Sequence, residues 1–378
     1  MLRDVDVDTE FFVESEEQRG LRAVLRSFFR ETCAHEQVRL QAASPRGHDE
    51  AHWQRLAKEV GVHGLAVPEQ YGGAGYSYAE LAVAMEEAGR ALCSLPLLST
   101  VVLAGAQLLE SGDEAACARY LPGIADGSLT ATVAGVVAAA DLRAEAGRGG
   151  WTLHGAADLV LDGQWAELIL VSARTVDGPR LFACGPRPDD CVRTPRRVLD
   201  ETRRMALLEF HGTSATPVGA PGDAPRALAA AVDRGRVALG AEQVGGVSHV
   251  LDATVEYVGQ RRQFGRPVGS FQAIKHRLAD LLVELEAARS AAAYATACAV
   301  AAPAGLPIAA SVAAAVCSDA YRRAAAEYVQ LHGGIGFTWE HPAHLYLRRA
   351  RADEVLLGTA AQHRSRIGEL LTAATSRK

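Results

Sequence analysis

The hydrophobic residues of this chain follow a helical period at both ends and a strand-like pattern in the middle, and this change limits the possible folds. Residues 14–37 place apolar side chains three and four positions apart, which predicts an amphipathic helix. From residue 128 to about residue 220 the helical period is lost. Short β-friendly runs there alternate with Gly, Pro and Asp turns. The pattern therefore predicts an α+β protein in which a β domain lies between two helical regions.

The last part of the sequence predicts four long helical stretches. They cover residues 228–258, 278–285, 287–302 and 308–331. The later stretches are rich in alanine, which has the highest helix propensity and lets helices approach closely. We therefore predict an N-terminal helical domain over residues 1–125, a middle β domain over 126–222 and a C-terminal four-helix bundle over 223–378.

Composition and charge exclude several classes of function. The 378 residues carry a net charge of −6 without a basic tail, which argues against nucleic acid or an anionic membrane as a partner. The seven cysteines are scattered and lack CxxC spacing, so neither a metal site nor a disulfide framework is expected. The N-terminus has no apolar core of a signal peptide, and polar residues interrupt the apolar stretch 92–109. These features predict a cytoplasmic enzyme with no membrane span.

Three motifs occur in a fixed order along the chain. They are GLAVPEQYGGAG at Gly64–Gly75, YVGQRRQFGRPVGSFQAIKHRLADL at Tyr257–Leu281 and QLHGGIGFTWEHPAHLYLRRA at Gln330–Ala350. Together with the domain order, these motifs resemble the FAD-dependent acyl-CoA dehydrogenase family over essentially the whole chain. The resemblance implies that family's fold, FAD as the cofactor, and α,β-dehydrogenation of an acyl thioester.

The resemblance also implies a set of cofactor contacts, and their chemistry suits FAD. A pyrophosphate is met well by the planar fork of a guanidinium, and Arg261 aligns with the family's pyrophosphate arginine. Glycine lets the backbone approach a ligand closely, as expected at positions 333 and 334. The residues implied as cofactor contacts are Arg261, Gln263, Phe264, Gln272, Gln330, Gly333, Gly334 and Thr359. In the family such residues reach the FAD of a neighbouring subunit. Arg262 is interpreted as a solvated charge and His332 as a packed histidine at a helix end.

The chain departs from the family at the catalytic base. The reaction needs a carboxylate to take a weakly acidic α-proton. Leu357 stands where most members have glutamate, and Gly235 stands at the alternative position before Arg236. Glu354 and Asp233 lie near in sequence, but each is expected to project in another direction. They are weak candidates, and no catalytic residue is expected at either usual position.

The flavin-ring contacts of the family are also missing. The segment Thr130–Gly147 has neither Thr-Glu-Pro nor Gly-Ser-Asp, and Ala156–Gly163 replaces the usual Trp-Ile-Thr run. Ala360 and Ala361 replace a Ser-Gln pair. The losses fall on contacts to the chain's own flavin, whereas the contacts offered to a neighbour remain.

Three hypotheses follow. The first is a subunit resembling the base-lacking chains of actinobacterial heterotetrameric acyl-CoA dehydrogenases, several of which act on CoA-linked steroid side chains. The second is a self-sufficient homotetramer with altered base or chemistry, such as oxidation of a carrier-bound acyl group or flavin-dependent hydroxylation. The third is a scaffold that binds no flavin. The expected partners are an acyl-CoA or acyl-carrier thioester, a related subunit or identical copies in a tetramer, and an electron-transferring flavoprotein.

Overall fold

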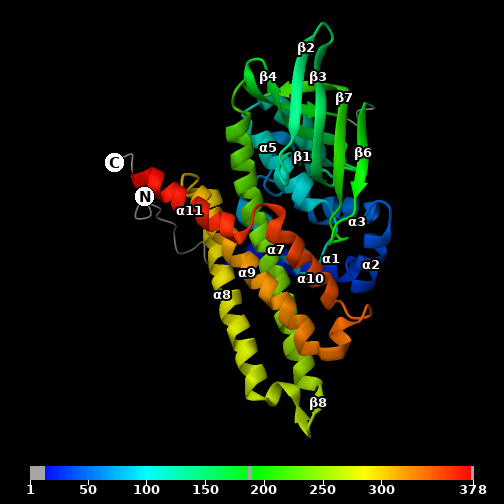
Figure 1. The fold of residues 1–378 in the computed structure, drawn as a ribbon, viewed down its shortest axis with the longest axis vertical. Helices are drawn as coiled ribbons and strands as arrows, with labels where there is room; N and C mark the ends of the chain where they lie inside the picture. The colour runs from blue at the N-terminus through cyan, green and yellow to red at the C-terminus, as the bar shows by residue number, and fades with distance from the viewer. Residues whose placement is uncertain (1–12, 186–189, 376–378) are drawn as a thin grey trace. The chain divides into compact units, whose positions relative to one another are not determined.

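The chain folds into two units, each assembled from separate stretches of sequence (Figure 1). The structure is a computed structural model that describes residues 13–185 and 190–375. Within these residues, the helical unit comprises 13–38, 82–93 and 236–375. The β unit comprises 39–81 and 94–235, apart from the gap at 186–189. The predicted division into three consecutive domains remains a prediction.

Among the described residues, seven helices lie wholly or mostly in the helical unit, and two of them, α4 and α7, begin in stretches assigned to the β unit. They are α1 (Glu16–Thr32), α4 (Tyr78–Arg90), α7 (Ala224–Gln260), α8 (Gln272–Ala301), α9 (Leu306–His332), α10 (Ala343–Leu356) and α11 (Ala360–Thr375). The connections include the hairpin β8 (Arg262–Gln263) and β9 (Arg266–Pro267), and the short turns η6 (Val268–Ser270) and η7 (Gly333–Phe337).

The helical stretches predicted at 278–285 and 287–302 are one continuous helix, α8. Glu286 and the alanines after it are good helix formers, so nothing in this sequence interrupts the backbone hydrogen bonds. Helices α10 and α11 extend the helical region beyond the four predicted stretches. Arginines are interspersed among the apolar residues of α10, and Arg349 is itself buried. This mixture obscured the period in the sequence.

Helices α4 and α7 pack with their backbones in contact. A Cβ atom added at Gly89 would lie 1.9 Å from the carbonyl oxygen of Glu242, and one at Gly245 would lie 1.8 Å from that of Glu86. Only glycine permits such an approach. The contact places the middle of the long helix α7 directly against α4.

The β unit contains a seven-stranded sheet preceded in sequence by short helices. The strands are β1 (Ala131–Ala134), β2 (Asp141–Gly147), β3 (Gly150–Leu161), β4 (Leu168–Thr175), β5 (Gly178–Cys184), β6 (Cys191–Arg196) and β7 (Met205–Val218). The helices and helical turns are α2 (His35–Ala43), α3 (Glu50–Arg55), η2 (Leu56–Val60), η3 (Val62–Gly64), η4 (Glu69–Tyr71), η5 (Leu97–Ala104), α5 (Gly105–Glu110) and α6 (Glu114–Ala125), and α2 begins in the helical unit.

The sheet closes on itself. Strands pair in the order β4–β2–β3–β7–β5, and β5 pairs again with β4. Most pairings are antiparallel, whereas β1 joins β4 in parallel. Closure leaves few free strand edges, and the enclosed core contains Leu153, Phe182 and Phe210.

The described residues contain neither a membrane-spanning helix nor a metal cluster. No described helix is both long and apolar enough to cross a membrane. No group of three or more His, Cys, Asp or Glu side chains among these residues could hold a metal ion. All seven cysteines are buried, and none of them forms a disulfide bond.

Candidate cofactor site

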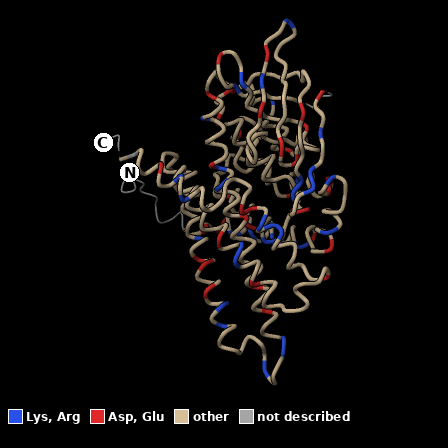
Figure 2. The backbone as a smooth tube through the Cα atoms, viewed as in Figure 1, with Lys and Arg blue, Asp and Glu red and all other residues tan. Residues whose placement is uncertain are grey.

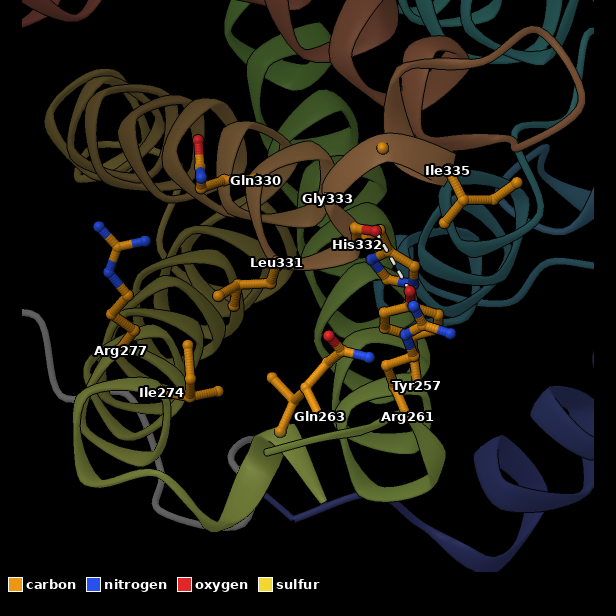
Figure 3. A pocket seen from close by; sticks show the side chains of 12 residues that line it. Tyr257, Arg261, Gln263, Ile274, Arg277, Gln330, Leu331, His332, Gly333 and Ile335 are labelled. Carbon is orange, nitrogen blue, oxygen red and sulfur yellow. Dashed lines mark hydrogen bonds between the residues drawn. The ribbon is translucent and has the colours of Figure 1, made fainter. Parts of the chain in front are cut away.

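A cavity of about 500 Å³ lies at one end of the helical unit (Figure 3). Its walls come from the last turn of α7, the β8–β9 hairpin, the first turns of α8 and the end of α9 with η7. Five of the eight residues implied as cofactor contacts line it, namely Arg261, Gln263, Gln330, Gly333 and Gly334. The structure thus brings together residues up to 73 positions apart in the sequence.

The cavity has two guanidinium groups on different walls and no acidic lining residue. Arg261 follows the end of α7, and its side chain has no hydrogen bond or ion pair within the described residues. Arg277 comes from α8 on the other side of the cavity (Figure 3), and its Nη1 lies 3.2 Å from the Glu327 carboxylate. Residues 257–279 include five Lys or Arg and no Asp or Glu, and Figure 2 shows this basic hairpin end. These charges favour an anionic ligand.

The glycines at the end of α9 face open space. Gly333 has φ +61° and ψ −137°, a conformation that only glycine adopts without strain. A Cβ atom added at Gly333 or Gly334 would have no heavy atom within 4 Å. There is therefore room for a ligand directly against this stretch of backbone, and the contact of these glycines with FAD stays a prediction.

The other three implied contacts lie outside the cavity lining. Phe264 is 91% exposed at the tip of the β8–β9 hairpin, where its φ is +52°. Gln272 is exposed at the first residue of α8. Thr359 precedes α11, where its hydroxyl accepts a hydrogen bond from the Gln362 amide (3.3 Å) and its own amide donates to the Gln362 side chain (2.8 Å). This reciprocal arrangement is a capping box.

The capping box predicts a stability effect for Thr359. Replacement Thr359→Ala is expected to lower the free energy of unfolding by about 0.5–2 kcal/mol, because an N-cap hydroxyl is lost. Chemical denaturation measures the change, and Thr372→Ala, at an exposed position within the same helix, is the matched control. A loss of FAD retention without a stability change would instead support the cofactor role that the family resemblance implies.

Sequence reasoning missed three polar or aromatic lining residues as site components. They are Tyr257, Arg277 and His332. His332 is 4% exposed, as a packed histidine should be, yet it also lines the cavity. Tyr257 could have been found from its position one helical turn before Arg261. Arg277 carries no comparable signal, since most arginines on helices are solvated.

Both usual base positions are apolar. Leu357 is 3% exposed at the end of α10, and its carbonyl oxygen accepts a hydrogen bond from Arg236 Nε (3.1 Å). Gly235 directly precedes Arg236 in α7. The region where the family places either glutamate therefore has no carboxylate from these two positions.

The two weaker candidates have other surroundings. The carboxylate of Glu354 pairs with Arg351 (3.1 Å) and lies 3.9 Å from Arg322. These contacts are those of a partly exposed ion pair on α10. Asp233 is 3% exposed and lies two residues before Gly235, on a different face of α7.

Side chains of the segment Ala156–Gly163 make their contacts within the β unit. Asp158 pairs with Arg196 at 2.8 Å, while Val160 and Leu161 are 2% and 4% exposed. Val160 belongs to the sheet's hydrophobic core. The side chains at these positions therefore stabilise the sheet and present neither an aromatic face nor a hydroxyl to a ligand.

Comparison with known proteins identifies the family of this chain. Models for the N-terminal and C-terminal domains of acyl-CoA dehydrogenase match residues 15–128 and 225–372. Acyl-CoA dehydrogenase IpdE2 of Mycobacterium tuberculosis is 36% identical over 345 residues, which cover 90% of this chain and 93% of that protein.

Two solved structures have the same fold over nearly the full length. A variant of the Tcur3481–Tcur3483 steroid ACAD is 33% identical with a TM-score of 0.86, covering 96% of this chain and 99% of that one. The ChsE4–ChsE5 complex from Mycobacterium tuberculosis contains a chain that is 27% identical with a TM-score of 0.86, covering 96% and 98%. This fold and this match define a flavin-dependent class of oxidoreductase. The chain belongs to the acyl-CoA dehydrogenase family, which confirms the family and fold predicted from its motifs.

Proposed function

We propose that this chain is the base-lacking subunit of a heterotetrameric acyl-CoA dehydrogenase. In this proposal its cavity binds the pyrophosphate and adenylate half of an FAD whose flavin ring is held by a related partner chain. One observation carries the proposal. The structure has a cavity lined by arginines and glycines, which suits an anionic ligand such as the pyrophosphate half of FAD, whereas both usual base positions are apolar.

The cavity residues match the chemistry of that half of the cofactor. Arg261 would meet the pyrophosphate with its guanidinium fork. The peptides at Gly333 and Gly334 would lie against the adenylate, because no side chain intervenes. The amides of Gln263 and Gln330 offer donors and acceptors beside them. When bound, FAD supplies the acceptor for the hydride that leaves the substrate's β-carbon.

The same chain is poorly equipped to hold the flavin ring. Val160 and Leu161 are buried where the family keeps ring contacts, and Ala360 and Ala361 have no hydrogen-bonding side chain. The partner would therefore supply the ring contacts and the glutamate that takes the α-proton. This chain would position the cofactor and contribute to the thioester pocket.

The names of similar proteins support the assembly and a substrate class. The two similar solved structures, Tcur3481–Tcur3483 and ChsE4–ChsE5, are each named for two chains, and the first is called a steroid ACAD. We therefore propose a CoA thioester of a steroid-derived acid as the substrate, and an electron-transferring flavoprotein as the electron acceptor.

Counting FAD tests the assembly. Co-purified with a related chain that has the glutamate, the complex is expected to hold two FAD per tetramer, since only the two partner chains can hold a flavin ring. Native mass spectrometry and flavin absorbance measure the ratio. Four FAD per tetramer, or a yellow homotetramer formed by this chain alone, would contradict the proposal and favour a self-sufficient enzyme.

A further inference from the structure

Tyr257 and His332 form a close pair at the edge of the cavity (Figure 3). The Tyr257 hydroxyl donates a hydrogen bond to the main-chain carbonyl oxygen of His332 at 3.2 Å. Their rings stack with centroids 4.2 Å apart and an interplanar angle of 22°. One side chain of α7 therefore contacts both the backbone and the ring of the last residue of α9.

His332 is also held from the side of its own helix. Its Nδ1 lies 2.8 Å from the Tyr328 carbonyl oxygen, and because a carbonyl only accepts, Nδ1 must carry the proton. The Tyr328 ring meets the imidazole edge-to-face at 4.7 Å. Burial lowers the pKa of His332 below its ordinary value, and the hydrogen bond to Tyr328 opposes this shift. The ring is therefore fixed between two tyrosines.

These contacts fix the peptide that leads into the glycine stretch. The peptide joining His332 to Gly333 has its C=O bound by the Tyr257 hydroxyl and its N–H bound to the Gln330 carbonyl. With both ends of this peptide held, the direction in which the chain continues depends on the dihedral angles of Gly333. A Cβ atom added at Gly333 or Gly334 would meet no heavy atom within 4 Å. The held peptide is therefore, together with the turn η7 that begins at Gly333, a contact that defines where these glycines lie.

Tyr257 also lies beside the cationic wall of the cavity. The amide of Arg261 donates to the Tyr257 carbonyl at 2.8 Å, so Arg261, which directly follows α7, lies one helical turn after Tyr257. The contact between Tyr257 and His332 thus sets the spacing between the guanidinium and the glycine backbone.

We propose that Tyr257 is a positioning residue for the cofactor: it couples the end of α7 to the end of α9, so that Arg261 and the Gly333–Gly334 backbone can contact one ligand together. This inference rests on the proposed function, in which that ligand is FAD. Tyr257 itself acts through His332 and need not touch the cofactor.

The experiment compares Tyr257→Phe with the parent chain, in complex with its partner and alone. The phenyl ring keeps the stacking but loses the hydroxyl. The FAD dissociation constant of the complex is expected to rise about 2- to 12-fold, the factor for loss of one net hydrogen bond. Amide exchange at Gly333, measured on the chain without FAD, is expected to accelerate by a similar factor. Tyr257→Leu, which also removes the stacking, is expected to have a larger effect on both.

Tyr294→Phe is the matched control, because Tyr294 lies on α8 outside the cavity lining, and it should change neither measurement. Unchanged exchange at Gly333 in Tyr257→Phe overturns the inference, and so does faster exchange with unchanged FAD affinity. The exchange measurement needs no cofactor, so it is separate from the proposed function. That function fails on a different result, namely a parent complex that binds no FAD. If Tyr257→Leu does not fold, Tyr257→Phe alone decides the matter.

Discussion

Without a partner, and with FAD and an artificial electron acceptor supplied, this chain is expected to oxidise saturated acyl-CoAs about 10²–10⁴-fold more slowly than a family member with its glutamate. The reason is the lack of a positioned base. Leu357 is buried and apolar where the α-proton acceptor should stand, and the alternative position is Gly235. Stopped-flow reduction of the flavin by substrate measures the step directly.

Restoring the carboxylate alone is not expected to restore activity. Leu357→Glu supplies an acceptor, but the ring contacts that Val160, Leu161, Ala360 and Ala361 would need to make are still absent. Leu357→Gln has similar size without basicity, so it separates a packing effect from a catalytic one. Adding the glutamate-bearing partner to the unmodified chain should recover activity where the substitution does not.

Two further substitutions test whether another carboxylate serves as the base. If the chain alone turns over as fast as an ordinary family member, the base has been misassigned. Glu354→Gln and Asp233→Asn then identify which carboxylate acts. Loss of that activity in either variant would replace the heterotetramer proposal by a self-sufficient enzyme.

The sequence predicted those parts of the site that depend on residue chemistry. The glycines at 333 and 334 were assigned from a motif, and the positive φ of Gly333 shows why glycine is required at that position. The guanidinium of Arg261 was assigned from the neighbouring motif, and it lines the same cavity. Both features are local, so a short stretch of sequence carries enough information to predict them.

Features that depend on tertiary contacts were not predictable in the same way. The stacking of Tyr257 on His332 joins residues that lie 75 positions apart in the sequence, on two different helices. No periodicity in either helix indicates this contact. The sequence likewise gives no indication of the backbone contact between Gly89 and Glu242. Thr359 illustrates another limit, because a threonine before a helix serves equally as a cap and as a ligand contact.

Removal of the Arg261 guanidinium is expected to be the most damaging single change to cofactor binding. Arg261→Ala in the heterotetramer should weaken FAD retention by about 2–5 kcal/mol, since the pyrophosphate charge loses its bidentate partner. That corresponds to a loss of affinity from about 30-fold to several thousand-fold. The flavin-to-protein absorbance ratio after exhaustive dialysis, followed by titration with FAD, measures it.

The chain provides its own control for this experiment. Arg262 is the next residue, carries the same charge, is exposed and lies outside the cavity lining. Its guanidinium donates to the hairpin carbonyl of Gly265 at 3.4 Å. Arg262→Ala should therefore leave FAD affinity within about twofold, because solvated surface charges contribute little. Arg261→Lys should fall between the two, since lysine keeps the charge but lacks the planar fork. Equal losses of FAD affinity in Arg261→Ala and Arg262→Ala would mean that the basic hairpin attracts the cofactor only through its overall charge. Unchanged FAD retention in both variants would show that the cavity is not the FAD site.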